Sequence, residues 1–151
     1  MGKTCCLISP LAAHSQHSFT TRLHLKKEIL SAVDEGFTIF LSSFEHGAET
    51  IFASVIAELK SSGHEIQLVA AISSRASIHK ADIDLLNLCD DIHICSRDTN
   101  IETTTIRDQY MIDISDLVLF IDHENTIEST SPIFRYAQAK EKNIRIIDIA
   151  I

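Results

Sequence analysis

Short apolar runs and longer amphipathic segments alternate along the whole chain. The short runs are rich in β-branched residues, and several are apolar at every position, which is typical of strands covered on both faces of a sheet. The pattern predicts six strands, at Thr4–Ile8, Thr38–Leu41, Ile66–Ile72, Asp91–Cys95, Leu117–Ile121 and Arg145–Ile149.

The segments between the predicted strands carry apolar residues at helical spacing. Leu25, Ile29 and Val33 follow one another at four-residue intervals, and Gly36 stands just after them, where a helix commonly ends. Pro132 falls in the first turn of the last segment, where a missing N–H costs little. The predicted helices are Thr21–Glu35, Ala48–Ser62, Ser77–Leu88, Thr103–Ile114 and Ser131–Lys142.

This order of elements predicts an α/β fold. Strands that alternate with helices give right-handed crossovers and a mostly parallel sheet of about six strands with helices on both faces, a Rossmann-like three-layer sandwich. The 151 residues suit a single domain, 1–151. In such a sheet, ligands bind beyond the carboxyl ends of the strands, near the point where the strand order reverses. Four loops are predicted there, Ser9–Thr20, Ser42–Gly47, Ser73–Ser77 and Asp122–Ser131.

Charge and hydropathy narrow the classes of partner. The net charge is −8, and no basic run is longer than Lys26-Lys27, which argues against a nucleic-acid partner. No stretch reaches the roughly 18 apolar residues of a membrane span, and the first residues do not resemble a signal peptide. We therefore expect a cytoplasmic protein with no membrane partner.

The sequence gives little support to metal, redox or hydrolytic chemistry. Its four cysteines form no CxxC pair, so reduced and mostly buried thiols are predicted. His14 and His17 would have to meet the stretch Asp122–Glu124 to hold a metal, and no metal site is predicted. There is no GxSxG motif, phosphate-binding P-loop or complete GxGxxG motif, and hence no predicted cofactor.

Several longer stretches carry a resemblance to a known family. They are TCCL near the start, EGFTIFLSSFEHGAETIFASVIAELK in the middle, IRDQYMIDISDLVLFID from Ile106 to Asp122, and FRYAQAKEKNIRIIDI near the end. The chain resembles the YpsA-like branch of the SLOG superfamily, Rossmann-like domains related to the LOG (lysine-decarboxylase-like) and DprA proteins. The third stretch is similar to that branch's run R-N-x-Y-M-V-D-x-S-D-x-L-I-A-V-Y. The resemblance implies a nucleotide-like ligand and a homodimer.

The chain departs from the family pattern at the loops that would hold a phosphate. The family's T-G-H-R-P corresponds to Ile8–Ala12, its S-G-M-A-x-G-x-D to Ser42–Glu49, and its G-G-T turn to Ser129–Ser131. Each loop has lost a glycine, which lets backbone N–H groups approach a phosphate closely. Phe44 and Glu45 are expected to add bulk and negative charge there, and a carboxylate within about 4 Å of a phosphate is repelled by roughly 1 to 4 kcal/mol.

Each candidate residue has a functional and a structural interpretation. Gly47 could donate its N–H to an anion at a helix N-terminus, while Ser42 and Ser43 could bind a ligand or cap that helix. Arg107 could pair with a phosphate, or with Asp113 or Asp116 in a structural ion pair. The candidate ligand-binding residues are Ser9, Ser42, Ser43, Gly47, Glu49, Arg107, Asp116, Ser129, Thr130 and Ser131.

These observations predict a non-catalytic SLOG-type sensor or interaction domain that binds a nucleotide-like or small anionic molecule at the carboxyl ends of the strands. The alternative is a nucleotide-processing enzyme, similar to LOG N-glycosidases (phosphoribohydrolases), with Glu49, Arg107 and Asp116 in its site. LOG relatives cleave the base–ribose bond with a Gly-Gly-Gly-Thr loop, whereas the corresponding turn here, Glu128–Pro132, has no glycine. A third possibility is a purely structural partner that uses exposed helix faces.

Overall fold

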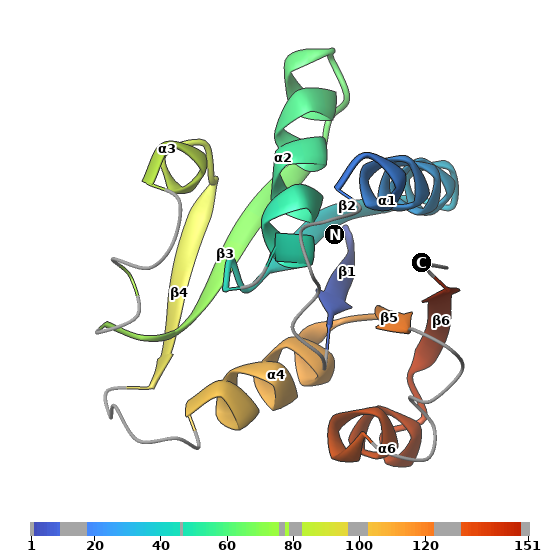
Figure 1. Ribbon diagram of the computed structural model, residues 1–151, viewed down its shortest axis with the longest axis vertical. Helices are drawn as coiled ribbons and strands as arrows, with labels where there is room; N and C mark the ends of the chain where they lie inside the picture. Colours follow the sequence, from blue (N-terminus) through green and yellow to red (C-terminus); the bar gives the residue numbers. More distant parts are fainter. Residues whose placement is uncertain are drawn as a thin grey trace.

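The computed structural model describes residues 2–9, 18–45, 47–75, 78, 83–96, 103–122 and 131–148. Its centre is one six-stranded sheet in the order β4-β3-β2-β1-β5-β6, in which every neighbouring pair is parallel (Figure 1). The strands are β1 Lys3–Ile8, β2 Phe37–Ser42, β3 Gln67–Ser74, β4 Asp91–Ser96, β5 Leu117–Asp122 and β6 Asn143–Asp148.

Helices cover both faces of the sheet, which gives three layers (Figure 1). One face carries α1 (Ser18–Asp34), α2 (Gly47–Ser61) and the short α3 (Ile83–Leu86). The other face carries α4 (Thr103–Ile114) and α6 (Pro132–Ala139). The predicted Rossmann-like α/β sandwich is therefore confirmed. No helix in the part of the chain that the structure describes is long and apolar enough to cross a membrane.

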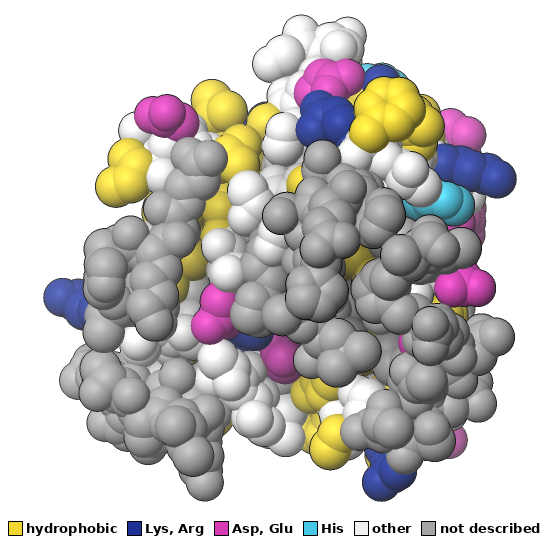
Figure 2. Space-filling model, viewed as in Figure 1, with side chains coloured by type: hydrophobic (Ala, Val, Ile, Leu, Met, Phe, Trp, Pro, Cys, Tyr) yellow, Lys and Arg dark blue, Asp and Glu magenta, His cyan; other side chains and the backbone are white. Residues whose placement is uncertain are grey.

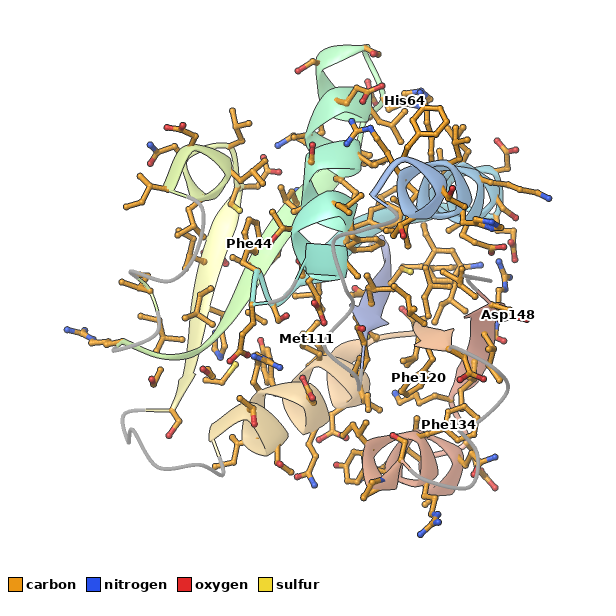
Figure 3. All side chains as sticks on the ribbon, viewed as in Figure 1. Phe44, His64, Met111, Phe120, Phe134 and Asp148 are labelled. Carbon is orange, nitrogen blue, oxygen red and sulfur yellow. The ribbon has the colours of Figure 1, made fainter. Side chains whose placement is uncertain are left out.

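The two faces of the sheet have separate apolar cores. Successive side chains of a strand point to opposite faces, so Cys5 packs toward α1 and α2 while Cys6 packs toward α4 and α6. On the second face, the rings of Phe120 and Phe134 meet edge to face with their centroids 5.0 Å apart (Figure 3). Burial on both sides explains why β5 is apolar at every position up to Asp122.

Some element boundaries differ from the predicted ones. The last helix ends at Ala139, before the predicted Lys142, because Glu141 has a positive φ of 57° that ends the helical path. The last strand consequently starts earlier, at Asn143. Of the predicted helix 77–88, the described part is helical at Ile83–Leu86.

The strand order reverses beside β1. From β1 the chain adds β2, β3 and β4 in one direction, then passes through α4 to place β5 on the other side of β1. The reversal therefore lies between β1 and β5, whose carboxyl ends are Ile8 and Asp122. A parallel sheet binds ligands beyond the strand ends at such a point.

Candidate functional site

Buried polar side chains gather at the carboxyl edge of the sheet. They lie at or just after the ends of β1, β2, β3 and β5, or near the starts of the helices that come next. Buried Ser115 is different, because it precedes β5 at the opposite edge. Burying such groups is costly unless they are hydrogen-bonded, so their concentration at one edge needs a reason. The residues are Ser9, Thr21, Ser42, Ser43, Glu49, Ser73, Ser74, Arg107, Asp122 and Ser131.

The serines of the β2–α2 turn support the turn itself. The Ser42 hydroxyl donates to the carbonyl of Glu49 at 2.8 Å and accepts the N–H of Phe44 at 3.3 Å. Ser43 Oγ accepts the N–H of Glu45 at 3.4 Å. Serine hydroxyls commonly stabilise turns through such local bonds. Both hydroxyls accept N–H groups of the turn itself, ahead of α2, so these contacts support a structural role in the turn.

Phe44 lies in this turn with a left-handed backbone, at a φ of 60°. Its ring is 2% exposed and packs into the core on the α1 and α2 face, beside the first turns of α2 (Figure 3). Phe44 thus belongs to the core, and the expected loss of space for a phosphate stays a prediction. By packing into the core, the Phe44 side chain holds the β2–α2 turn against the sheet.

Arg107 is a buried cation at this edge, with a side chain that is 5% exposed. Its Nε and Nη2 donate to Oδ1 of Asp108 at 3.0 and 2.7 Å, and its Nη1 donates to Oε2 of Glu45. Glu45 and Asp108 are more exposed, at 24% and 21%. The predicted ion pair with Asp113 or Asp116 is wrong. Instead, Arg107 joins α4 to the β2–α2 turn.

Asp116 lies at the opposite edge from the other candidates. Its N–H donates to the carbonyl of Thr4 at 2.8 Å, and its carboxylate accepts the N–H of Thr4 at 2.9 Å. Thr4 is near the amino end of β1, so these bonds fix the start of β5 beside the start of β1. The structure does not bring Asp116 to Glu49 and Arg107, so we remove it from the candidate site.

The remaining candidates divide between this edge and the residues that are not described. Gly47 and buried Glu49 form the first turn of α2, where a carboxylate is favourable with the helix dipole. Buried Ser9 follows β1. Ser131 caps α6 by accepting the N–H of Phe134 at 3.2 Å. Two candidates, Ser129 and Thr130, lie outside the described residues.

Sequence reasoning placed Ser73 and Ser74 in a loop at this edge without naming them as candidate residues. Ser73 and Ser74 end β3 just as Ser42 and Ser43 follow the apolar part of β2, and the repeated Leu-Ser-Ser and Ile-Ser-Ser endings could have shown this. Asp108 was missed as a partner of Arg107. Among the described residues, no group of three or more His, Cys, Asp or Glu side chains is placed to hold a metal ion.

Exposed apolar side chains lie over α1 and around α3 (Figure 2). Phe19 and Leu23 are one helical turn apart on α1 and are 74% and 55% exposed. Ile83 and Leu88, at α3 and just beyond it, are 61% and 54% exposed. The outer faces of these two helices thus present apolar surface to solvent.

The cysteines are reduced, and burial suppresses their acidity. Cys5 and Cys6 are buried, Cys89 and Cys95 are half-buried, and none of the four is in a disulfide. Burial raises the pKa of Cys5 well above its usual value, that of Cys6 to about 12, and those of Cys89 and Cys95 to about 11. Thiols in this state are poor nucleophiles at neutral pH.

We expect Cys5 and Cys6 to resist Ellman's reagent at pH 8 in the native protein, while all four thiols react in urea. Because the folded pKa values lie above the unfolded value of 9.0, the thiols favour the folded state below pH 9. That contribution falls as the pH rises from 9 toward 11 to 12, so the urea midpoint should decrease over this range. Rapid native labelling of Cys6 would contradict its placement in the core.

Comparisons with known proteins support the fold. The sequence matches no known protein family, and no curated protein matches it. The X-ray structure of TM1055, a Northeast Structural Genomics Consortium target, is similar, with a TM-score of 0.63 and 10% sequence identity. The match covers 94% of this chain and 72% of that one. At this identity the similarity shows the fold alone.

Proposed function

We propose that the protein is a non-catalytic SLOG-type sensor or interaction domain that binds a nucleotide-like or small anionic molecule at the carboxyl edge of its sheet. The concentration of buried polar residues at that edge carries the proposal. Burying polar side chains costs free energy that their hydrogen bonds serve to offset, so a cluster of them at one edge supports a use beyond packing. Arg107 supplies the cation for an anionic ligand.

A binding role is favoured over an enzymatic one. Ser42 already donates its hydroxyl proton to the carbonyl of Glu49, so this hydroxyl has no base beside it that would make it a nucleophile. The enzyme alternative relied on Glu49, Arg107 and Asp116 acting together, and Asp116 lies at the other edge. The SLOG resemblance supports a nucleotide-like ligand.

Calorimetry with adenosine monophosphate tests the proposal, with adenosine as the matched neutral control. We expect the monophosphate to bind with a submillimolar dissociation constant and to shift backbone NMR signals at Ser9, Ser42–Gly47 and Arg107. Adenosine should bind more weakly. No binding of a panel of nucleotides at millimolar concentration would exclude the ligand, and chromatographic release of free adenine would replace the proposal by the enzyme alternative.

We also propose that the chain forms a homodimer, which the family resemblance supports. The exposed side chains of Phe19 and Leu23 give one apolar helix face that self-association could cover. Light scattering over a hundredfold range of protein concentration tests this. A monomer at every concentration would remove the dimer and leave the ligand proposal unaffected.

A further inference from the structure

We infer that Glu45 occupies the position on Arg107 that the anionic group of the ligand takes, so that binding requires the Glu45 carboxylate to leave. This inference rests on the proposed ligand-binding function and adds a regulatory contact to it. Until a ligand binds, the Glu45 carboxylate is the anion that pairs with this end of Arg107.

The geometry of the guanidinium separates the roles of its two partners. Asp108 accepts from Nε and Nη2, which fixes one edge of the planar group. Asp108 is also the next residue in the same helix, so it stays beside Arg107 whenever α4 is folded. Glu45 accepts from Nη1, which points toward the β2–α2 turn. Asp108 therefore orients Arg107, and Glu45 occupies the remaining end of the fork.

The charges make the second carboxylate replaceable. One carboxylate neutralises the guanidinium, and Glu45 and Asp108 together leave the cluster with a net charge of −1. A third anion at the same guanidinium would be repelled by both carboxylates. A ligand anion must therefore exchange with one of them, and the carboxylate held by the turn is the one that can be released.

Glu45 is placed to move without disturbing the core. Its side chain is 24% exposed, compared with 5% for Arg107, so it can rotate toward water while Arg107 stays in place. Its backbone N–H makes a long bond of 3.4 Å to Ser43 Oγ. The preceding residue, Phe44, is held in the core and keeps the turn attached to α2. Displacement of Glu45 thus needs a local rotation and no unfolding.

The exchange favours a phosphate over other small anions. The arginine fork matches the oxygen spacing of both carboxylates and phosphates. A ligand carboxylate would replace a carboxylate with no gain in acceptors, whereas a phosphate monoester brings three acceptor oxygens to the same guanidinium. We therefore assign the group that displaces Glu45 as a phosphate, either inorganic or carried on a small molecule.

The test compares wild type with Glu45→Gln, which keeps the shape of the side chain and removes its charge. The apparent affinity of a protein falls with the fraction of molecules that can bind. If Glu45 occupies Arg107 about nine-tenths of the time, its removal should tighten binding about tenfold. Inorganic phosphate, adenosine monophosphate and adenosine are the probes, measured by calorimetry, and the affinity for adenosine should not change. Comparing the affinities for inorganic phosphate and for adenosine monophosphate distinguishes a site that binds phosphate alone from one that also contacts the nucleoside.

Glu35→Gln is the matched control, because Glu35 also pairs with an arginine, Arg145, at 2.5 Å, and follows α1 at the opposite edge. It changes the net charge equally and should leave phosphate affinity unchanged. Asp108→Asn should tighten binding less than Glu45→Gln, because it removes one repulsive charge but leaves the Glu45 carboxylate on Nη1. If Glu45→Gln and Glu35→Gln tighten phosphate binding equally, the change in net charge explains the effect and the inference is overturned.

A measurement on wild type keeps the inference testable if Glu45→Gln does not fold. The side-chain carboxyl carbon of Glu45 can be followed by NMR during titration with phosphate. We expect its signal to move toward that of a solvated glutamate as phosphate binds. If phosphate binds while this signal stays unchanged, the inference fails and the proposed function stands. If neither phosphate nor nucleotide binds wild type or Glu45→Gln, the proposed function itself fails.

Discussion

Replacing Arg107 with alanine is expected to lower the free energy of unfolding by about 3 kcal/mol. Removing one partner of a buried ion pair leaves uncompensated charge, and this typically costs about 3 to 5 kcal/mol. The lower end applies because Glu45 and Asp108 are 24% and 21% exposed and can regain some hydration. The substitution also separates α4 from the β2–α2 turn. Urea denaturation at pH 7 measures the change.

Arg145→Ala provides the control for this prediction. Arg145 pairs with Glu35 where the two side chains are 27% and 44% exposed, and such a pair is worth less than about 1 kcal/mol. The two substitutions remove the same side chain and the same charge. Equal losses of stability would show that burial gives Arg107 no special role at the carboxyl edge.

The fold follows closely from the apolar pattern because each strand is covered on both faces. Cys5 and Cys6 face different cores, so no polar residue interrupts β1 after Thr4, and the run is conspicuous in the sequence. The same reason makes Leu117–Ile121 visible as a strand. The end of α6 was misjudged because it depends on the left-handed backbone of Glu141, a residue type that gives no signal for such a turn.

The candidate site was less predictable because its contacts are distant in the sequence. Glu45 and Arg107 are 62 residues apart, and no spacing rule relates them. Asp116 lies in the stretch whose resemblance to the SLOG pattern pointed to a site, yet its N–H and its carboxylate both bond to the backbone of Thr4 at the amino edge. In the structure, Asp116 fixes where β1 and β5 begin. A sequence motif predicts at which edge of the sheet a residue lies only if it is known whether the residue precedes or follows its strand.

Phe44→Ala is expected to destabilise the protein by about 3 kcal/mol, the lower end of the usual cost for a buried phenylalanine. The ring is 2% exposed in the core beside α2, so its removal leaves a cavity. Phe44→Gly should cost less than Phe44→Ala, by up to about 1.5 kcal/mol. Glycine normally loses about 0.5 to 1 kcal/mol to alanine through its greater freedom when unfolded, but a φ of 60° costs other residues about 1 to 2 kcal/mol.

Phe19→Ala is the matched control, because Phe19 is 74% exposed and its loss should change stability by less than about 0.5 kcal/mol. If Phe44→Ala were equally mild, the ring would lie outside the core and could fill the ligand position after all. If Phe44→Ala strongly lowers stability but leaves phosphate affinity unchanged, Phe44 and Glu45 have different roles in the turn. Phe44 would hold the turn in place, and Glu45 alone would control access to Arg107.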